Sequence, residues 1–533
     1  MRRCAAASIT HTRWRIRHGE SSTEAVRGGG KGLAIAAAAT AGASFAQPDP
    51  PVAFDSGSTF VTPSSPRALA VTPPGFDLVG TGASLFADGY PEVAVAAWED
   101  GVIRFYRNQN TWDTNPGQAL TPITFPGNVT ELDVFDDLNL AVNGVNQIRD
   151  IEFVDMTGDG FPDLVVAVRY FEDIDGDGNN EEIGQILHYR ALLPGTTNFE
   201  FDLLSSVVLE LPVSRFTVDD FSQDGRPDIL VATESVLATS GQPNPSRVFV
   251  IRNDVIGSLA GFLTRLPDQI LPNQFSPAFN VVAGEMKLLT SGGGLGGGGT
   301  GNTLVFATFG GNGPGDIVLG TGNGTAPFGF VVSSETGTVC GTNSSGLSGG
   351  TQPGTGDAQA LVLFDPFANA DQSLAAHPGT DTVSLLHNRT RFGSFYHLCD
   401  GAINRDVYDV TPCIAPSSVP LLPNFGSYIA AGNLNGDPFD DLVHVDAFNR
   451  NAALLLGCGS PDPTHVIMEF YCDESDYFLL NYAALDSTAY DRVLCADMNL
   501  DGLDDVLITV NSFYIPDDGL LLGSLRVYVN TTP

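Results

Sequence analysis

The stretch Asp155-Met-Thr-Gly-Asp-Gly-Phe-Pro-Asp163 runs directly into the apolar segment Leu164-Val-Val-Ala167, and this combination decides the fold. The stretch places Asp or Asn at position 1, a polar residue at position 3, and Asp at positions 5 and 9. Three further copies occur at Asp220–Asp228, Asn433–Asp441 and Asp497–Asp505, and each also precedes a short apolar run. A loop and strand that recur in register predict a repeat architecture.

The side chains of this loop are typical of calcium ligands. Oxygens at positions 1, 3, 5 and 9 can converge on a hard cation, and the carbonyl of position 7 can complete the shell. Positions 1, 3, 5, 7 and 9 hold Asp155, Thr157, Asp159, Phe161 and Asp163; Asp220, Ser222, Asp224, Arg226 and Asp228; Asn433, Asn435, Asp437, Phe439 and Asp441; and Asp497, Asn499, Asp501, Leu503 and Asp505. A hairpin turn with solvated carboxylates explains any single copy. The repetition instead predicts structural Ca²⁺ in all four loops.

An EF-hand is excluded because position 12 is never acidic. Each unit instead continues into a further alternating strand that tends to end in Asn, as in Val102–Asn108, Arg247–Asn253, Thr382–Asn388 and Ser524–Asn530. Looser copies at 185–190, 328–332 and 451–456 bring the number of units to seven. Degenerate loops are then expected at 84–92, at 308–316 and around Asp357, before Leu361–Phe364.

Seven strand-rich units with almost no helical periodicity predict an all-β fold, a seven-bladed β-propeller of four-stranded blades over residues 47–533. Two β-sandwich domains would not explain seven related units. Fourth strands are expected near Thr197–Phe201 and Phe392–Tyr396. The sequence ends after the third strand of the last unit, so the N-terminal segment Ser58–Thr62 is predicted to close the last blade.

In its four intact loops the chain resembles the FG-GAP/VCBS repeat proteins, whose best-known propeller is the head of integrin α subunits. The resemblance implies a calcium-binding propeller, and it departs from the family pattern in units one, four and five. Members include adhesins, lectin-like proteins and lyases, so the resemblance implies fold and metal far better than activity.

A fifth loop differs in its place within the unit. Asp173, Asp175, Asp177, Asn179 and Glu181 repeat the calcium pattern between the second and third strands of unit two. Successive turns of an up-and-down blade alternate ends, so this loop is expected on the opposite face from the other four. We interpret it as a calcium site that bridges the protein to an acidic or polyhydroxyl ligand. The alternative is a calcium that only orders a long hairpin.

The N-terminal segment predicts export. Residues 1–46 contain the apolar run Leu33–Ala43 and the small residues Ser44–Ala46, typical of a signal peptide, behind an Arg-rich extension that suggests a mis-assigned start. We expect a secreted or cell-surface protein, the bacterial periplasm included. A net charge of −37 disfavours nucleic acid and anionic membranes. No membrane span is predicted, and the expected state is a monomer.

The cysteines fit an exported chain. Six lie after Cys4, an even number that favours disulfides. The preferred pairs are Cys399 with Cys413 and Cys458 with Cys472, which leaves Cys340 with Cys495 as a third.

Signals for an enzyme are weak in the sequence. Gly346–Gly350 and Gly292–Gly297 match catalytic or phosphate-binding patterns only within Gly-rich loops. No catalytic residue is assigned, although the many carboxylates could include an acid/base pair. The favoured function is a calcium-binding adhesion or recognition module for an extracellular protein or glycan. The alternatives are a calcium-dependent polysaccharide lyase or hydrolase on the same fold, and a purely structural matrix protein.

Overall fold

The structure is a computed structural model in which the chain divides into two units, Met1–Pro50 and Pro51–Pro533. Within the second unit it describes, with short gaps, residues 52–74, 89–123, 131–192, 200–233, 247–270, 278–284, 303–308, 316–322, 330–331, 360–364, 373–377, 382–386, 405–409, 428–446, 451–455, 489–514 and 521–532. The predicted signal segment lies outside the described residues.

The second unit is a seven-bladed β-propeller, as the sequence predicts. Seven antiparallel sheets follow one another along the chain, and six of them have four or more described strands. Blade one contains β2 (Pro66–Val71), β3 (Val93–Ala97), β4 (Val102–Asn108) and β5 (Leu120–Pro122), with β6 (Glu131–Asp133) also on β4. Blade two contains β7 (Gln147–Val154), β8 (Asp163–Glu172), β9 (Glu181–Leu192) and β10 (Glu200–Leu209). Blade three contains β11 (Val213–Asp219), β12 (Asp228–Thr233), β13 (Arg247–Ile256) and β14 (Leu259–Arg265), with β15 (Gln269–Ile270) also on β13.

The remaining blades complete the series. Blade four contains β16 (Ala278–Gly284), β17 (Thr303–Thr308), β18 (Asp316–Gly322) and β19 (Phe330–Val331). Blade five contains β20 (Ala360–Phe364), β21 (Ser373–His377), β22 (Thr382–Leu386) and β23 (Arg405–Asp409). Blade six contains β24 (Tyr428–Gly432), β25 (Asp441–Asp446) and β26 (Asn451–Leu455). Blade seven contains β27 (Ala489–Ala496), β28 (Asp505–Tyr514), β29 (Leu521–Tyr528) and β1 (Ser58–Thr62).

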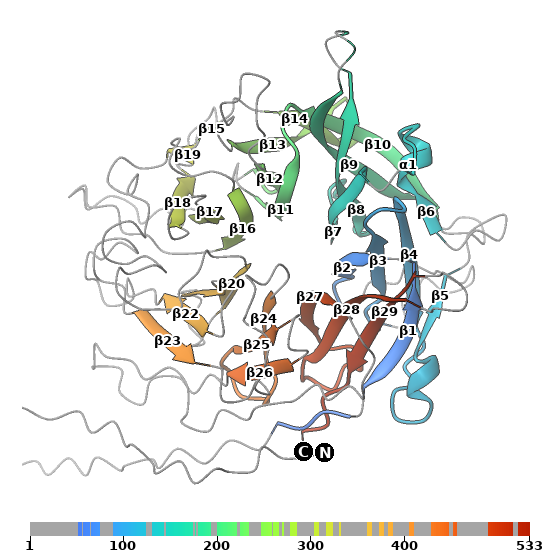
Figure 1. The fold of residues 1–533 in the computed structure, drawn as a ribbon, viewed down its shortest axis with the longest axis vertical. Helices are drawn as coiled ribbons and strands as arrows, with labels where there is room; N and C mark the ends of the chain where they lie inside the picture. The colour runs from blue at the N-terminus through green and yellow to red at the C-terminus, as the bar shows by residue number, and fades with distance from the viewer. Residues whose placement is uncertain are drawn as a thin grey trace, which may run out of the picture. The chain divides into compact units, whose positions relative to one another are not determined.

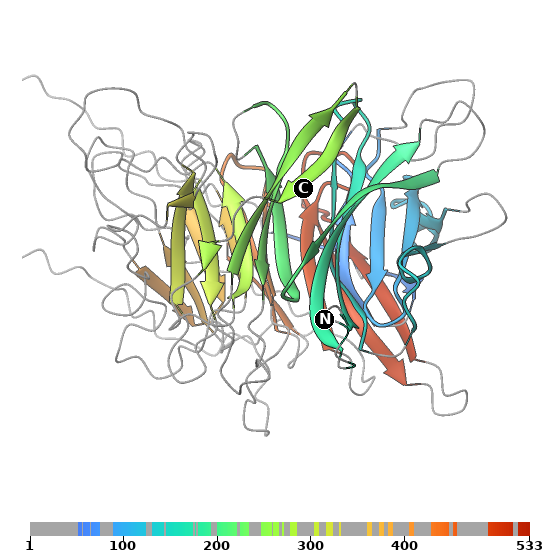
Figure 2. The same ribbon diagram turned by 90° about the horizontal axis from the view of Figure 1, so that it is seen from above.

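The first strand of each blade lies innermost, and these strands close the ring. Each contacts its neighbour in the order β2, β7, β11, β16, β20, β24, β27 and back to β2 (Figure 1). Figure 2, the edge-on view, shows the strands running between the two faces of the ring. The described helical pieces, α1 (Val134–Asp137) and η1 (Pro116–Gln118), are short connectors.

The last blade closes as predicted. β1 pairs antiparallel with β29, with Ser58 opposite Val527 and Thr62 opposite Gly523. Phe60 of β1 is 5% exposed and meets Trp112 edge to face at 6.1 Å between ring centroids. The N-terminal strand therefore pairs the outer edge of blade seven and also contacts blade one.

The register of units four and five differs from the sequence prediction. In blade four, residues 308–316 join the second and third strands, so they do not replace a first-to-second-strand loop. In blade five, Leu361–Phe364 belongs to the innermost strand β20, and the fourth strand is β23, not Phe392–Tyr396. Both errors arise where the loop has lost its oxygens, because the loop supplied the register. Asp357 and Phe392–Tyr396 lie outside the described residues.

The core lies between neighbouring blades. Position 2 of the loop contributes to it, since Met156, Leu434 and Met498 are fully buried. Met156 packs with apolar residues of blades two and three, including Phe216, and Met498 packs with Val93 of blade one. Burial of these three side chains gives the loops of blades two, six and seven an apolar anchor.

Candidate functional site

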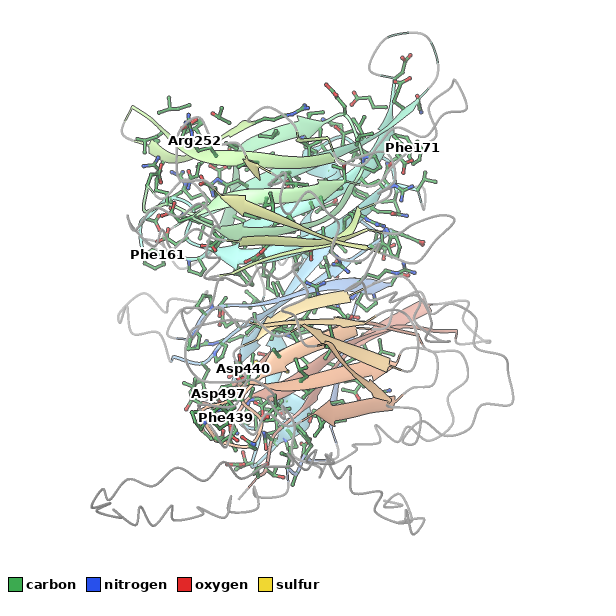
Figure 3. All side chains as sticks on the ribbon, turned by 90° about the vertical axis from the view of Figure 1, so that its left-hand side faces the viewer. Phe161, Phe171, Arg252, Phe439, Asp440 and Asp497 are labelled. Carbon is green, nitrogen blue, oxygen red and sulfur yellow. The ribbon has the colours of Figure 1, made fainter. Side chains whose placement is uncertain are left out.

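The four intact loops join the first and second strands of blades two, three, six and seven. Figure 3 shows Phe161, Phe439 and Asp497 along one face of the ring and Phe171, which precedes the fifth loop, on the other. The predicted separation of the two kinds of loop is therefore present in the structure.

The position-1 carboxylate organises each loop by accepting backbone hydrogen bonds. Asp155 Oδ1 accepts from the amides of Gly158 (2.7 Å) and Asp159 (3.1 Å), and Oδ2 accepts from Gly160 (2.8 Å). Asp220 and Asp497 accept in the same way from positions 5 and 6. Asn433, with an amide instead of a carboxylate, accepts from Gly436. Gly160 has φ of +87°, which favours glycine at position 6.

Positions 3 and 5 turn toward each other within the loop. Asn499 Nδ2 lies 2.8 Å from Asp501 Oδ2, and Asn435 Nδ2 lies 2.9 Å from Asp437 Oδ2. The other oxygen of the position-5 carboxylate accepts the position-7 amide, as Asp501 does from Leu503 at 2.9 Å. The side chains that the sequence assigns to one ion are therefore neighbours in space.

The position-9 carboxylate has a role that the sequence did not reveal. Asp163, Asp228, Asp441 and Asp505 are all fully buried. Asp505 Oδ2 accepts from the amide of Met498 at 2.9 Å, and its Oδ1 accepts from the amide of Asn530 at 2.6 Å. Asp228 and Asp163 accept likewise from Asn253 and Ala191 on the third strands. In blades two, three and seven this carboxylate therefore joins the second strand to the third strand or to the residues that follow it. In blades two, six and seven it also joins the second strand to its own loop.

Burial makes the ionised form of these carboxylates costly without a cation. Loss of solvation raises the pKa of Asp505 to about 8, against the opposing hydrogen bonds from Asn530 and Met498. Burial also raises the pKa of Asp159. A bound divalent ion would favour the charged form and oppose this cost.

Calcium in the loops stays a prediction. In the described part of the chain no three His, Cys, Asp or Glu side chains gather closely enough to hold a metal ion together. The loops take position 3 from Thr, Ser or Asn, and a calcium shell also uses such oxygens and main-chain carbonyls. The donor types and the proximity of positions 3 and 5 fit Ca²⁺.

An asparagine latch between blades was also missed by the sequence reasoning. Asn253 Nδ2 donates to the carbonyl oxygen of Met156 (2.7 Å), Asn530 to that of Leu434 (2.7 Å), and Asn108 to that of Met498 (2.6 Å). Asn108 ends β4, Asn253 lies within β13 and Asn530 follows β29, and each reaches position 2 of the preceding blade's loop. The recurrent Asn after these strands was the available signal.

The fifth loop connects β8 and β9 of blade two. Asp173 accepts from the amides of Gly176 (2.7 Å) and Gly178 (3.0 Å), the same pattern that position 1 shows in the blade loops. Glu181 opens β9 opposite Glu172. Asp175, Asp177 and Asn179 lie outside the described residues.

A Ser–His–Asp arrangement occurs where blades two and three meet. His188 Nε2 lies 3.2 Å from Asp163 Oδ2, and Ser205 Oγ lies 3.4 Å from His188 Nδ1. His188 is fully buried, however, and Ser205 Oγ donates to the carbonyl of Gly261 at 2.8 Å. A nucleophile must reach its substrate, so we assign these residues to packing.

In five blades the innermost strand has a β-bulge near its first residues, at the end opposite the blade loops. The pairing register shifts at Arg67, Arg149, Ser214, Phe279 and Asp491 in blades one, two, three, four and seven. Bulges re-aim side chains and are frequent beside functional sites. The residue after the bulge is Asp150 in blade two, Arg215 in blade three and Arg492 in blade seven.

These three residues meet near the axis of the ring. Asp150 is 3% exposed, and its Oδ1 lies 3.1 Å from Arg215 Nη1 and 3.7 Å from Arg492 Nη2. Glu152, two residues further along β7, is half-buried. Burial and then the charge of Asp150 raise the pKa of Glu152 to about 8. We call Asp150, Glu152, Arg215 and Arg492 the axial cluster.

The cysteine prediction is wrong for one pair. Cys495 has a free thiol, so it does not pair with Cys340. It lies in the contact between blades six and seven, where burial raises its pKa. The other five cysteines after Cys4 lie outside the described residues.

No protein-family model matches the sequence, and no curated protein matches it. Among solved structures, the α-L-arabinofuranosidase Arb93A of Fusarium graminearum with an iminosugar inhibitor is similar at 8% identity and a TM-score of 0.36, covering 90% of this chain and 98% of the other. The GH93 α-L-arabinofuranosidase of the same organism with arabinobiose has 9% identity and a TM-score of 0.35, covering 89% and 98%. This likeness transfers neither residues nor an activity. Within the described residues no helix is long and apolar enough to cross a membrane.

Proposed function

We propose that the chain is an exported, calcium-binding propeller that recognises an extracellular glycan or protein through the face carrying the Asp173–Glu181 loop. By its loop spacing and resemblance it is an FG-GAP/VCBS-type repeat protein. The difference between the two faces carries the proposal. On one face the loop carboxylates are turned onto backbone amides of their own blades. The other face holds the fifth loop at a hairpin tip and the bulged ends of the innermost strands.

Calcium has a separate role on each face in this proposal. In the blade loops it offsets the repulsion of clustered carboxylates and adds its binding energy to folding. In the Asp173–Glu181 loop it leaves coordination positions for ligand oxygens. Loops on a rigid scaffold are where binding residues concentrate.

A glycan array probed with the exported protein tests this function. Calcium-dependent binding to a defined glycan, lost in EGTA and restored by added Ca²⁺, is the expected result. Binding to no glycan, together with capture of no extracellular protein in calcium, would contradict recognition and leave a structural matrix role.

The axial cluster favours a second candidate, a polysaccharide hydrolase or lyase. Glu152 stands two residues from Asp150 on β7, with the Cα atoms about 7 Å apart along the strand, and acidic residues of this kind are what glycoside hydrolysis uses. The raised pKa of Glu152 keeps its carboxyl protonated near neutral pH, as a general acid requires. Release of reducing or unsaturated ends from polysaccharides, abolished by Glu152→Gln, would establish this activity. Equal release by the wild type and the variant would exclude Glu152 as the acid.

A further inference from the structure

The calcium-type loops of blades six and seven are hydrogen-bonded to each other. Asp504 lies at position 8 of the blade-seven loop, and Asn433 opens the blade-six loop. The main-chain amide of Asp504 donates to the carbonyl oxygen of Asn433 at 2.8 Å, and the amide of Asn433 donates to Asp504 Oδ2 at 2.7 Å. Figure 3 shows Phe439 and Asp440 of the blade-six loop beside Asp497 of the blade-seven loop. Asp504 therefore holds both main-chain groups of the first predicted ligand in the neighbouring loop.

Asn530 adds to this contact because its side chain reaches both loops. Its Nδ2 donates to the carbonyl oxygen of Leu434 at 2.7 Å and to that of Asp504 at 3.1 Å. Its main-chain amide donates to Oδ1 of Asp505, the position-9 carboxylate of blade seven. Leu434, Asp505 and Asn530 are buried, so breaking these bonds leaves polar groups without water as a substitute. Movement of the blade-seven loop therefore also moves positions 1 and 2 of the blade-six loop.

The close approach of the two loops depends on Gly432, the last residue of β24. A Cβ atom at this position would lie 2.5 Å from Asp504 Oδ2 and 2.6 Å from Cys495 Cβ, closer than Cβ atoms approach other atoms in proteins. In the other intact loops the residue before position 1 carries a side chain, namely Val154, Asp219 or Ala496. Among the four intact loops, only that of blade six therefore has the glycine that this approach requires.

Position 8 shows the same restriction to this pair of blades. It is Pro162 in blade two and Pro227 in blade three, whereas blade six has Asp440 and blade seven has Asp504. Proline has neither an amide hydrogen nor a carboxylate. Pro227 therefore cannot make toward the blade-two loop either of the two bonds that Asp504 makes toward the blade-six loop. The neighbouring loops of blades two and three provide a comparison within the same chain.

We propose that the calcium sites of blades six and seven form a coupled pair in which Asp504 is a positioning residue. Calcium held by the blade-seven loop would fix Leu503 and Asp505 on either side of Asp504, and with them the carboxylate that holds Asn433. The blade-six site needs Asn433 in place as its first ligand. Because coupling between two sites is reciprocal, occupation of either site favours occupation of the other. The proposal rests on the calcium binding of the proposed function and adds that these two sites fill together.

Equilibrium dialysis of the full chain with radioactive Ca²⁺, over a range of free Ca²⁺ concentrations, tests the coupling. Asp497→Ala with Asp501→Ala removes the blade-seven site. This variant should lose one ion outright and bind a second ion only at a free Ca²⁺ concentration about tenfold higher than the wild type needs. The matched control is Asp220→Ala with Asp224→Ala, which removes the blade-three site. It should lose one ion and bind the remaining ions at the free Ca²⁺ concentrations that the wild type needs.

Substitutions of Asp504 separate positioning from the loss of a ligand. Asp504→Ala keeps every predicted ligand of both loops but removes the acceptor for the amide of Asn433, so one ion should bind about tenfold more weakly. Asp504→Asn keeps an acceptor oxygen and should restore most of this affinity. If Asp504 only supports the fold, Asp504→Ala should lower the Tm in EGTA and leave the calcium affinity unchanged, and that result would overturn the proposal.

The failure of the coupling differs from the failure of the calcium assignment. Loss of a single ion from the blade-seven variant, with wild-type affinity for all remaining ions, would overturn the coupling and leave calcium binding in the loops intact. Absence of bound calcium from the wild type would reject the calcium assignment and the coupling together. If the blade-seven variant does not fold, the comparison of Asp504→Ala with Asp504→Asn decides, and equal wild-type affinity in both would overturn the coupling.

Discussion

The side-chain Nδ2 of Asn253 donates a hydrogen bond to the main-chain carbonyl of Met156 at a distance of 2.7 Å. This bond joins blade three to the loop of residues 155–163 in blade two. The side-chain oxygen of Asn253 meanwhile accepts from the amide of Gly261 at 3.0 Å. Asn253 is fully buried, so neither partner has water as a substitute. The loops are thus part of the contact between blades as well as turns within them.

Loss of this latch should destabilise the propeller. Asn253→Ala leaves two buried backbone groups without partners, each costing about 1–3 kcal/mol. In a large domain each kcal/mol of lost stability lowers the Tm by about 2–4 °C, so the Tm of Asn253→Ala should be several degrees below that of the wild type. Asn115→Ala, which removes only an exposed hydrogen bond to Gln118, is the matched control and should leave the Tm unchanged. Equal effects of the two variants would show that the latch is dispensable.

The closing strand gives a second stability test. Phe60 of β1 is 5% exposed, whereas Val61 beside it is 58% exposed. Phe60→Ala should cost about 3–5 kcal/mol because it opens a cavity against Trp112. Val61→Ala should change stability by about 0.5 kcal/mol or less. Urea unfolding of both variants checks this, and similar midpoints would mean that β1 adds nothing to closure.

Removal of calcium should lower stability through the four blade loops. A ligand at one hundred times its Kd adds about 2.7 kcal/mol per site. Thermal unfolding in EGTA should therefore fall well below that in excess Ca²⁺, and elemental analysis should find calcium in the purified protein. The same Tm with and without EGTA, together with the absence of calcium from the purified protein, would reject the assignment of these residues as calcium ligands.

Stability of the metal-free protein should depend on pH in a direction set by Asp505. Its folded-state pKa of about 8 lies above the ordinary value of 3.8, so the folded state holds the proton more tightly than the unfolded state. The contribution of Asp505 to stability is therefore greatest below about pH 4, and it declines as the pH rises toward 8. Glu152 adds the same sign. Chemical unfolding in EGTA at several values between pH 5 and pH 8 measures how the free energy of unfolding changes with pH. In Asp505→Asn this free energy should depend less on pH than in the wild type. The same pH dependence in both proteins would contradict the role of Asp505.

The features that short sequence patterns determine, namely the turns of the intact loops and the closing strand, were predicted from the sequence. The nine-residue loops located the first-to-second-strand turns of four blades, and Ser58–Thr62 was recognised as the closing strand because one strand was missing at the end. In units four and five the predicted strands were offset by one strand from the observed ones, because the loops there have lost the residues that locate the first-to-second-strand turn. The axial cluster could not be predicted, since Asp150 and Arg492 are brought together only by ring closure and by a bulge in each strand. The burial of position 9 likewise depends on the third strand, which the loop pattern does not contain.

The fifth loop should separate function from folding. Asp175→Ala with Asp177→Ala removes two predicted ligands from a hairpin connection, where loss of side chains exposes no core and usually costs about 0.5 kcal/mol or less. The Tm in calcium should therefore stay close to that of the wild type, while calcium-dependent ligand binding is lost. The matched variant is Asp497→Ala with Asp501→Ala in blade seven, whose carboxylates accept amides of the loop that anchors Met498. That variant should lower the Tm and retain binding. Global unfolding of the fifth-loop variant would show that the calcium in this loop is structural. Unchanged ligand binding would show that this calcium only orders the hairpin between β8 and β9.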